Sequence, residues 1–188
     1  MTPRLIKELA CQLPHYIKTI SCTPHKDVYL HLRSHTFLNR VLFFLKNHSL
    51  TQYKVLVDIV AVDFLNELNR FELIYVLLST KLNSRIYIKL NLNNFFSMDT
   101  ISDLYPSANW LEREVWDMYG IFFYGHLDLR RILNNYGFNG YSLRKDFSLT
   151  GYISFRYDDF NKLILNEKTE LSQFNLDFNS KKTPWRYG

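Results

Sequence analysis

Charged and polar side chains gather between residues 112 and 146, in a stretch that also holds most of the glycines. The residues there that could do chemistry are Glu112, Arg113, Glu114, Asp117, His126, Asp128, Arg130, Arg131, Arg144, Lys145 and Asp146. Carboxylates near a histidine could supply acid–base catalysis or hold a metal ion, and paired arginines could clamp a phosphate. Glycine-containing irregular segments commonly carry function, so this stretch is the candidate site.

The spacing of these residues argues against an independent active site. On a helix, Glu112 and Glu114 would point about 200° apart and could not bind one ion together. The sequence shows no Gly-x-Ser-x-Gly, no phosphate-binding glycine loop and no repeated Cys-x-x-Cys. Asp128 and Asp146 lie close to the arginines, which favours structural salt bridges over phosphate binding. We therefore expect no catalytic, cofactor-binding or metal-binding residue; a free-standing hydrolase that uses His126 is the alternative.

The two cysteines, Cys11 and Cys22, form the pattern Cys-x3-His…Cys-x2-His with His15 and His25. Zinc modules usually repeat tighter pairs than the ten-residue gap between these cysteines. Reduced thiols in a reducing compartment are the better interpretation.

The composition is that of a globular domain that binds no nucleic acid. The chain has 188 residues, of which 47% are hydrophobic and 22% charged, enough to form its own core. Its net charge is +5, and the excess of Lys and Arg lies in residues 1–50 and 161–188. These basic residues are scattered among acids, whereas nucleic-acid binders usually carry a dense basic stripe. A basic nucleic-acid-binding domain is therefore only an alternative.

Membrane spans and targeting segments are not expected. No apolar run approaches the ~18 residues that a bilayer span requires. The first thirty residues lack the apolar core of a secretory signal and the composition of an organellar presequence. We expect a soluble or peripheral protein that is synthesised where it works.

Hydrophobic periodicity predicts an α+β domain of two layers, with a mainly antiparallel sheet and flanking helices. A helix is expected over residues 3–20, broken near Pro14, and a second helix is expected after the capping residue Ser34. The expected strands are Asp27–Leu32, Tyr53–Asp63, Arg70–Ser79 and Arg85–Leu92. Short turns separate the last three strands, which indicates an antiparallel meander.

A further helix is predicted after the capping residue Asn109; it should run to Tyr119 and stop at Gly120. Asn109 followed by Glu112 resembles a capping box, and a glycine commonly follows the last helical residue. Arg113 and Asp117 are four residues apart and could form an ion pair. So much of this helix is apolar that we expect it to be covered on more than one side, which indicates a partner surface.

The sequence suggests three parts: an N-terminal extension (residues 1–26), an α+β domain (residues 27–160) and an extended C-terminal tail (residues 161–188). The tail contains apolar residues without a sustained period, and Trp185 stands near its end. We expect the tail to cross a partner surface with Trp185 as an anchor; a strand that returns to the chain's own sheet is the alternative.

Two long blocks of sequence resemble a known family. The first is Glu112-Arg-Glu-Val-Trp-Asp-Met-Tyr-Gly-Ile-Phe-Phe123, followed by His126-Leu-Asp-Leu-Arg-Arg-Ile-Leu133. The second is Tyr136-Gly-Phe-x-Gly140, followed by Leu143-Arg-Lys-Asp-Phe147 and Leu149. Together they resemble the signature of the 30 kDa subunit family of respiratory complex I, with a strong match over about residues 112–159. Leu127, Ser142 and Ser148 stand where the family usually has proline, which affects loop rigidity more than identity.

The resemblance implies a non-redox subunit in the peripheral arm of proton-pumping NADH:ubiquinone oxidoreductase. It would belong to the quinone module, pack against the quinone-site (49 kDa-type) subunit and serve assembly and electron transfer. Flavin and iron–sulfur clusters would lie in partner subunits, and contact with the membrane would be made only through the complex. The implied location is the matrix side of the mitochondrial inner membrane, with the gene in the organelle. An equivalent subunit of a plastid or hydrogenase-type complex is the alternative.

The same resemblance turns the candidate site into a candidate interface. The polar residues of the first list, together with Gly120 and Trp185, would then be structural or partner-binding residues.

Overall fold

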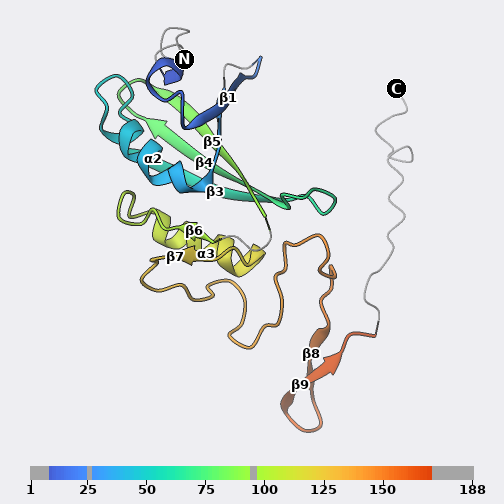
Figure 1. Ribbon diagram of the computed structural model, residues 1–188. Coiled ribbons are helices and arrows are strands. Elements are labelled where there is room, and N and C mark those ends of the chain that lie inside the picture. Colours follow the sequence, from blue (N-terminus) through green and yellow to red (C-terminus); the bar gives the residue numbers. More distant parts are fainter. Residues whose placement is uncertain (1–8, 25–26, 94–96, 171–188) are drawn as a thin grey trace, which may run out of the picture. The chain divides into compact units, whose positions relative to one another are not determined.

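A computed structural model describes residues 9–24, 27–93 and 97–170 (Figure 1). The chain divides into two compact units, Met1–Lys145 and Asp146–Gly188, which are described in turn. In the described part of the chain, no helix has the length and apolar character that crossing a membrane requires. The predicted division at residues 26 and 160 stays a prediction, and Trp185 lies outside the described residues.

The first unit is built on a five-stranded sheet. Its strands are β1 (Ile17–Cys22), β2 (Val28–Leu32), β3 (Val55–Asp63), β4 (Phe71–Ser79) and β5 (Ser84–Leu92), in the order β1-β2-β5-β4-β3. The antiparallel meander β3-β4-β5 is confirmed, and β1 pairs antiparallel with β2. Strand β2 runs parallel to β5, with Leu30 opposite Ile88, a pairing that the sequence did not indicate.

Alternation along the strands divides the sheet into a buried and a half-exposed face. In β4, the residues Phe71, Leu73, Tyr75 and Leu77 are buried, and the residues between them are partly exposed. The helix α2 (Leu38–Asn47) adds buried leucines to the same core, and α3 (Ala108–Tyr119) packs against β3 (Figure 1). This is the expected two-layer α+β domain.

The N-terminal part differs from the predicted helix. Residues 9–12 are helical, but residues 17–22 form strand β1, so the helix predicted up to residue 20 is wrong there. Pro14 separates the two elements, and the β-branched residues Ile17, Thr19 and Ile20 favour a strand. Ser34 does cap the next element: its side chain accepts a hydrogen bond from the backbone of Thr36 in the 3₁₀ helix η1 (His35–Phe37), which leads into α2.

Helix α3 starts two residues earlier than predicted, at Ala108 instead of Trp110, and ends where predicted. Ser107 precedes it without a side-chain cap bond, so Asn109 lies inside the helix and the predicted cap is wrong. Gly120 ends the helix with φ at +74°, in the left-handed region that glycine adopts without strain. Short strands on either side, β6 (Met98–Asp99) and β7 (Phe123–Tyr124), pair in parallel.

The second unit contains an antiparallel hairpin, β8 (Ile153–Asp158) and β9 (Leu163–Lys168). The sequence predicted neither strand, although Ile153, Phe155 and Tyr157 alternate with polar residues as a half-covered strand does. Residues 161–168 of the predicted tail therefore form the turn and second strand of a hairpin.

Candidate functional site

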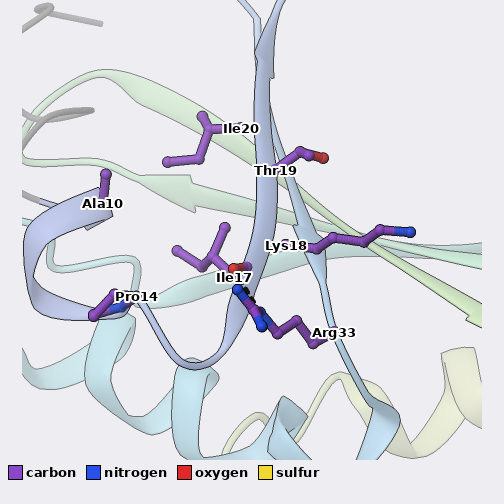
Figure 2. A pocket seen from close by; sticks show the side chains of 7 residues that line it. All are labelled: Ala10, Pro14, Ile17, Lys18, Thr19, Ile20 and Arg33. Atoms are coloured by element: carbon purple, nitrogen blue, oxygen red, sulfur yellow. Dashed lines mark hydrogen bonds between the residues drawn. The ribbon is translucent and has the colours of Figure 1, made fainter.

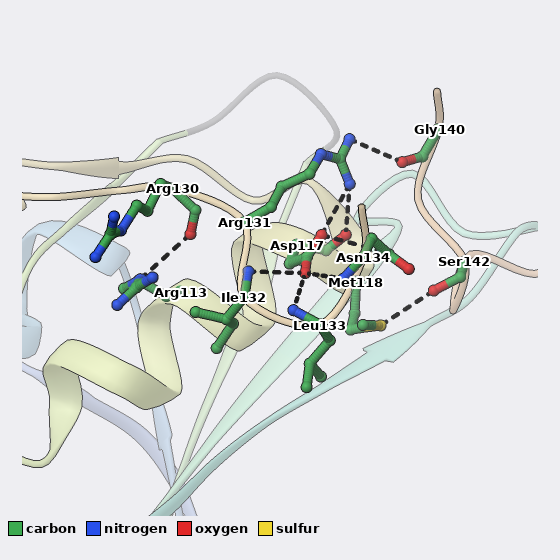
Figure 3. A network of polar contacts seen from close by, with 10 residues as sticks. All are labelled: Arg113, Asp117, Met118, Arg130, Arg131, Ile132, Leu133, Asn134, Gly140 and Ser142. Carbon is green, nitrogen blue, oxygen red and sulfur yellow. Dashed lines mark hydrogen bonds and ion pairs between the residues drawn. The ribbon is translucent and has the colours of Figure 1, made fainter. Parts of the chain in front are cut away.

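Asp117, near the end of α3, organises the segment of the first unit that follows the helix (Figure 3). Its carboxylate is fully buried and lies 2.8 Å from Nη1 of Arg131. It also accepts hydrogen bonds from the backbone N–H groups of Ile132, Leu133 and Asn134 and from the side chain of Asn134, at 2.8–3.1 Å. One helical carboxylate thus fixes four consecutive loop residues, 131–134.

These bonds decide the charge state of Asp117. Burial by itself would raise the pKa of the carboxyl group. The hydrogen bonds from the backbone of Asn134 and Leu133 and from Arg131 outweigh this effect and lower the pKa to about 2. Asp117 is therefore an anion at neutral pH, and it occupies the kind of N–H concavity that elsewhere binds free anions.

Arg131 and Arg144 attach the rest of the segment. The second guanidinium nitrogen of Arg131 donates to the carbonyl of Gly140 at 3.0 Å, and Nε of Arg144 donates to the carbonyl of Tyr119 at 2.6 Å. Both guanidinium groups lie against the ring of Tyr141, at 5.3 and 4.5 Å from its centre. Arg144 thereby satisfies a carbonyl at the C-terminal end of α3, where a cation is also favoured by the helix dipole.

Gly120 permits this close contact. A Cβ atom at this position would lie 2.5 Å from the ring of Tyr141 and 2.8 Å from Arg144 Nη2. The ring of Tyr141 also packs edge-on against Trp116 of α3. The apolar side of α3 that predicted a partner surface is thus covered here by the chain's own loop.

Glu112 joins α3 to the strand region before it. Its side chain is fully buried and accepts hydrogen bonds from the hydroxyl of Thr100 at 2.6 Å and the backbone of Ile101 at 2.8 Å. Burial raises the pKa of Glu112, although these two bonds and nearby His126 act in the opposite direction. The glutamate that was predicted to cap the helix instead ties together two segments of the core.

His126 is also used internally. The backbone N–H of Asp128, two residues further on, donates a hydrogen bond to Nδ1 of His126 at 3.2 Å. Because Nδ1 accepts this bond, the N–H group of the ring is at Nε2, which donates to the carbonyl of Asn109 at 3.2 Å. The imidazole side chain is fully buried and lies 3.8 Å from Glu112. Both ring nitrogens hold the turn after β7, and neither faces an open cleft.

The remaining charged residues of α3 and the loop separate into internal and exposed groups. Arg113 stacks on Trp110 at 4.7 Å and donates to the carbonyl of Arg130 at 3.2 Å, so the predicted Arg113–Asp117 pair is wrong. Arg130 forms the expected ion pair with Asp128 at 3.1 Å, with both side chains more than half exposed. Glu114 is exposed on α3.

Asp63, at the end of β3, is a structural residue that the sequence reasoning missed. It accepts two hydrogen bonds from Arg70, at 2.7 and 2.9 Å, and one from the backbone N–H of Lys145 at 2.9 Å. The bonds from Arg70 lower its pKa in spite of burial. A carboxylate that ends one strand, seven residues before an arginine that starts the next, was the available signal. The side chain of Lys145 is exposed, as is that of Asp146 at the start of the second unit.

The remaining chemical candidates are metal ligands and thiols. Within residues 9–24, 27–93 and 97–170, no three His, Cys, Asp or Glu side chains come together to hold a metal ion. Cys11 and Cys22 are free, exposed thiols.

Apolar side chains are exposed where the charged ones are buried. In the loop after β7, the exposed apolar residues are Leu127, Leu133, Tyr136 and Leu143, and Tyr136 is 87% exposed. In the hairpin of the second unit they are Ile153, Phe155, Tyr157, Leu163 and Ile164 on the strands and Phe160 in the turn. Within the first unit, the ion pair between Asp117 and Arg131 therefore fixes a loop whose apolar side chains are exposed.

A family model and curated relatives of the chain name the same kind of subunit. The family model described as "Respiratory-chain NADH dehydrogenase, 30 Kd subunit" matches residues 31–153. NADH-ubiquinone oxidoreductase subunit 9 of Prototheca wickerhamii is 50% identical over 79% of this chain and 77% of its own length. The same-named subunit of Acanthamoeba castellanii is 51% identical over 85% of this chain and 80% of its own length.

Solved structures share the fold. The trypsin-resistant fragment (1-134) of Nqo5 is 27% identical, with a TM-score of 0.56 over 67% of this chain and 97% of the fragment. A chain of the membrane-bound sulfane sulfur reductase, an archaeal respiratory membrane complex, has a TM-score of 0.65 over 77% of this chain and 84% of its own length; at 23% identity it shows the fold alone. The family match covers both α3 and the loop fixed by Asp117, and the chain belongs to the 30 kDa subunit family of respiratory-chain NADH dehydrogenase.

Proposed function

We propose that the chain is a non-redox subunit of proton-pumping NADH:ubiquinone oxidoreductase. It belongs to the quinone module of the peripheral arm and packs against the quinone-site subunit, on the matrix side of the mitochondrial inner membrane. Its membrane contact is made only through the complex. The names of its relatives, NADH-ubiquinone oxidoreductase subunit 9, support the membership.

The observation that carries a role in assembly is the apolar face of the β8–β9 hairpin. Strand pairing places Ile153, Phe155, Tyr157 and Ile164 on one face, and all four are exposed. Asn166 and Lys168 of β9 share this face. The opposite face carries Ser154, Asp158, Leu163, Leu165 and the ion pair between Arg156 and Glu167 at 2.8 Å. Strand β8 is thus amphipathic, with its apolar side chains on one face and its polar side chains on the other.

A two-stranded hairpin with exposed apolar side chains needs a surface to cover it. Isolated hairpins are marginally stable in water, and exposed apolar area is unfavourable by about 25 cal/mol per Å². In the part of the chain that the structure describes, these four side chains stay exposed. A partner subunit that receives this face would gain the hydrophobic contribution, and Phe155, 62% exposed at the centre of β8, is the expected anchor.

The charged signature then has a supporting role. Asp117, Arg131 and Arg144 fix the loop after α3, and the loop presents its apolar side chains outward. In this proposal Glu112, Arg113, His126 and Gly120 act in the same way. The exposed residues Glu114, Asp128, Arg130, Lys145 and Asp146 are proposed to contact partner subunits. Trp185 is proposed as a contact of the tail with the partner.

The redox groups are proposed to reside in partner subunits. Protein iron–sulfur clusters are usually held by about four Cys or His ligands, and this chain contains only Cys11 and Cys22 as thiols. We also propose that the chain has no catalytic site of its own. Purified protein is expected to be colourless; flavin or cluster absorbance at one equivalent per chain would contradict this.

The test compares two neighbouring residues on opposite faces of β8. Phe155→Asp places a charge on the apolar face, and Ser154→Asp places the same charge on the polar face. We expect Phe155→Asp to release the chain from the large NADH:ubiquinone oxidoreductase particle on native gels and to reduce its quinone reductase activity. Ser154→Asp should leave both unchanged.

The free chain provides the control. Phe155 lies outside the core of the first unit, so both variants should keep the melting temperature of the free wild-type chain. If the wild-type chain does not enter the large particle, membership in the complex is refuted. Full retention of Phe155→Asp would refute the hairpin as the assembly surface.

A further inference from the structure

Strand β1 is an open edge of the five-stranded sheet, far in the sequence from α3 and the hairpin. Among the described residues it pairs only with β2, and Lys18, Thr19, Ser21 and Cys22 are all exposed. The opposite edge strand, β3, packs against α3 and buries Ile59, Ala61 and Asp63, although Val55, Val57 and Val60 are exposed. Over residues 18–22, β1 is an edge that another chain can reach, and unlike β3 it contacts no helix of the described residues extensively.

The hydrogen-bond pattern identifies which main-chain groups point outward from β1. The N–H of Thr23 bonds to the carbonyl of Asp27 at 3.0 Å, which makes these residues a hydrogen-bonded pair. Pairs alternate along an antiparallel ladder, so Ile20 and Cys22 form non-hydrogen-bonded pairs with β2. Their N–H and C=O groups therefore point away from β2, toward the open edge.

The same edge is already occupied where β1 begins. The outward N–H of Ile17 bonds to the carbonyl of Leu13 at 3.2 Å, and its outward carbonyl accepts Nε of Arg33 at 3.3 Å (Figure 2). No corresponding bond reaches Ile20 or Cys22 from any other described residue. The open ladder thus extends from the bulge at Lys18 to the end of the strand.

A groove of about 490 Å³ runs beside this edge. Figure 2 shows Ile17 and Ile20 on the side of β1 that faces Ala10 and Pro14, which gives one apolar wall. Lys18 extends on the other side of the strand, whereas the guanidinium of Arg33 points back toward the carbonyl of Ile17. Among the described residues, no carboxylate forms an ion pair with Lys18 or Arg33.

We propose that β1 receives an extended segment of a neighbouring subunit as an added sheet strand. Alternate side chains of an added strand point to opposite faces, so this segment should alternate aliphatic with acidic residues. Its aliphatic side chains lie against Ile17, Ile20, Ala10 and Pro14, and its acidic side chains lie beside Lys18. Its main chain bonds to Ile20 and Cys22. The identity of the neighbour as a complex subunit rests on the proposed function.

Charge favours this occupant over a second copy of the chain. Strand β1 carries Lys18 and no acidic residue, so pairing of two β1 edges would bring like charges together. Lysine and a bulge are also common means of preventing self-association at an edge. An acidic segment turns the same lysine into an attractive contact.

Hydrogen exchange, resolved to single amides in the intact complex and in the free full-length chain, tests the proposal. The N–H groups of Ile20 and Cys22 should exchange quickly in the free chain and about tenfold or more slowly in the complex. The N–H of Ser21, already bonded to β2, serves as the internal control and should change little. Equal slowing of all three amides, or of none, would overturn strand addition.

Further outcomes of the same experiment distinguish other occupants of the edge from a failure of the proposed function. Protection of Ile20 and Cys22 in the dilute free chain would show that its own residues fill the edge, and protection that rises with concentration would show a second copy; either overturns the proposal. A chain that never enters the complex refutes the proposed function instead.

Charge reversal provides the matched variant. Lys18→Glu should lower the fraction of the chain in the complex several-fold, whereas Lys54→Glu, exposed just before the opposite edge strand, should not. Unchanged assembly of Lys18→Glu would overturn the acidic character of the segment.

Discussion

The loop that follows α3 and β7 (residues 125–145) and the β8–β9 hairpin reverse the usual distribution of residue types. In the loop, charged groups lie inside: Asp117 and Arg131 form a buried pair, and Arg144 binds a helix carbonyl. In the hairpin, apolar groups lie outside, with Phe155 and Tyr157 exposed and the ion pair Arg156–Glu167 on the opposite face. Charged residues can therefore have a structural role, while exposed apolar residues are available to bind a partner.

The physical reason is that buried backbone N–H groups need hydrogen-bond acceptors. A loop that follows a helix has N–H groups without partners in a helix or sheet, and each is costly when buried unpaired. A single carboxylate with several acceptor positions can satisfy a whole turn, as Asp117 does. A hairpin already pairs its backbone in the ladder, so its side chains are free to meet another chain.

Removal of the Asp117 carboxylate should have the largest effect on stability. Asp117→Ala leaves Arg131 and three backbone N–H groups without their acceptor, and breaking a buried pair costs about 3–5 kcal/mol. We expect a loss of this size in the free energy of unfolding of the free chain, measured by urea denaturation. Asp117→Asn keeps one acceptor oxygen and should lose less. A change below about 1 kcal/mol would show that the loop is not fixed from Asp117.

Substitution of Gly120 should follow in size. Gly120→Val combines a left-handed backbone with a Cβ 2.5 Å from the ring of Tyr141, so we expect a loss of about 2–4 kcal/mol in the same measurement. Gly120→Ala carries the same Cβ without β-branching and should cost less than valine. An unchanged melting temperature for Gly120→Val would contradict the close contact between helix end and loop.

The elements with a regular hydrophobic period were predictable, and those that depend on distant partners were not. Alternation gave the β3-β4-β5 meander, and Gly120 gave the end of α3. The parallel pairing of β2 with β5 leaves no local sequence signal, because the two strands are joined through two other strands and a helix. Hydrophobic alternation over Ile153–Asp158 was present but stood inside a stretch interpreted as irregular.

At the candidate site, residue type was predictable and role was not. Spacing of four on a helix suggested that Asp117 would pair with Arg113, yet the carboxylate binds N–H groups 14 to 17 residues further on. Glu112 likewise does not take part in the predicted capping box; its buried side chain accepts a hydrogen bond from Thr100 instead. In both cases a desolvated set of donors brought by tertiary structure competes successfully with a solvent-exposed local partner.

Acid should expose the contribution of Asp117 next. Its pKa is lowered from 3.8 to about 2 on folding, so it stabilises the fold fully above pH 4 and loses this contribution as the pH falls toward 2. The loss amounts to about 2 kcal/mol. Glu112 has the opposite sign, because its raised pKa makes protonation less costly. The difference in unfolding free energy between wild type and Asp117→Asn, followed from pH 6 to 2, isolates Asp117, and a constant difference would contradict its lowered pKa.

Substitution of Arg130 should have the smallest effect on stability, and its neighbour Arg131 provides the matched contrast. Arg131 binds the buried Asp117, whereas the Arg130–Asp128 pair is more than half exposed, and exposed pairs contribute about 0–1 kcal/mol. Arg130→Ala should therefore change the unfolding free energy of the free chain by less than about 0.5 kcal/mol, while Arg131→Ala should cost several times more. Arg113 needs only the backbone carbonyl of Arg130, which the substitution keeps. If Arg130→Ala destabilised the free chain as much as Arg131→Ala, exposure would not separate architectural from surface charges, and the contrast between loop and hairpin would fail at its most closely matched pair.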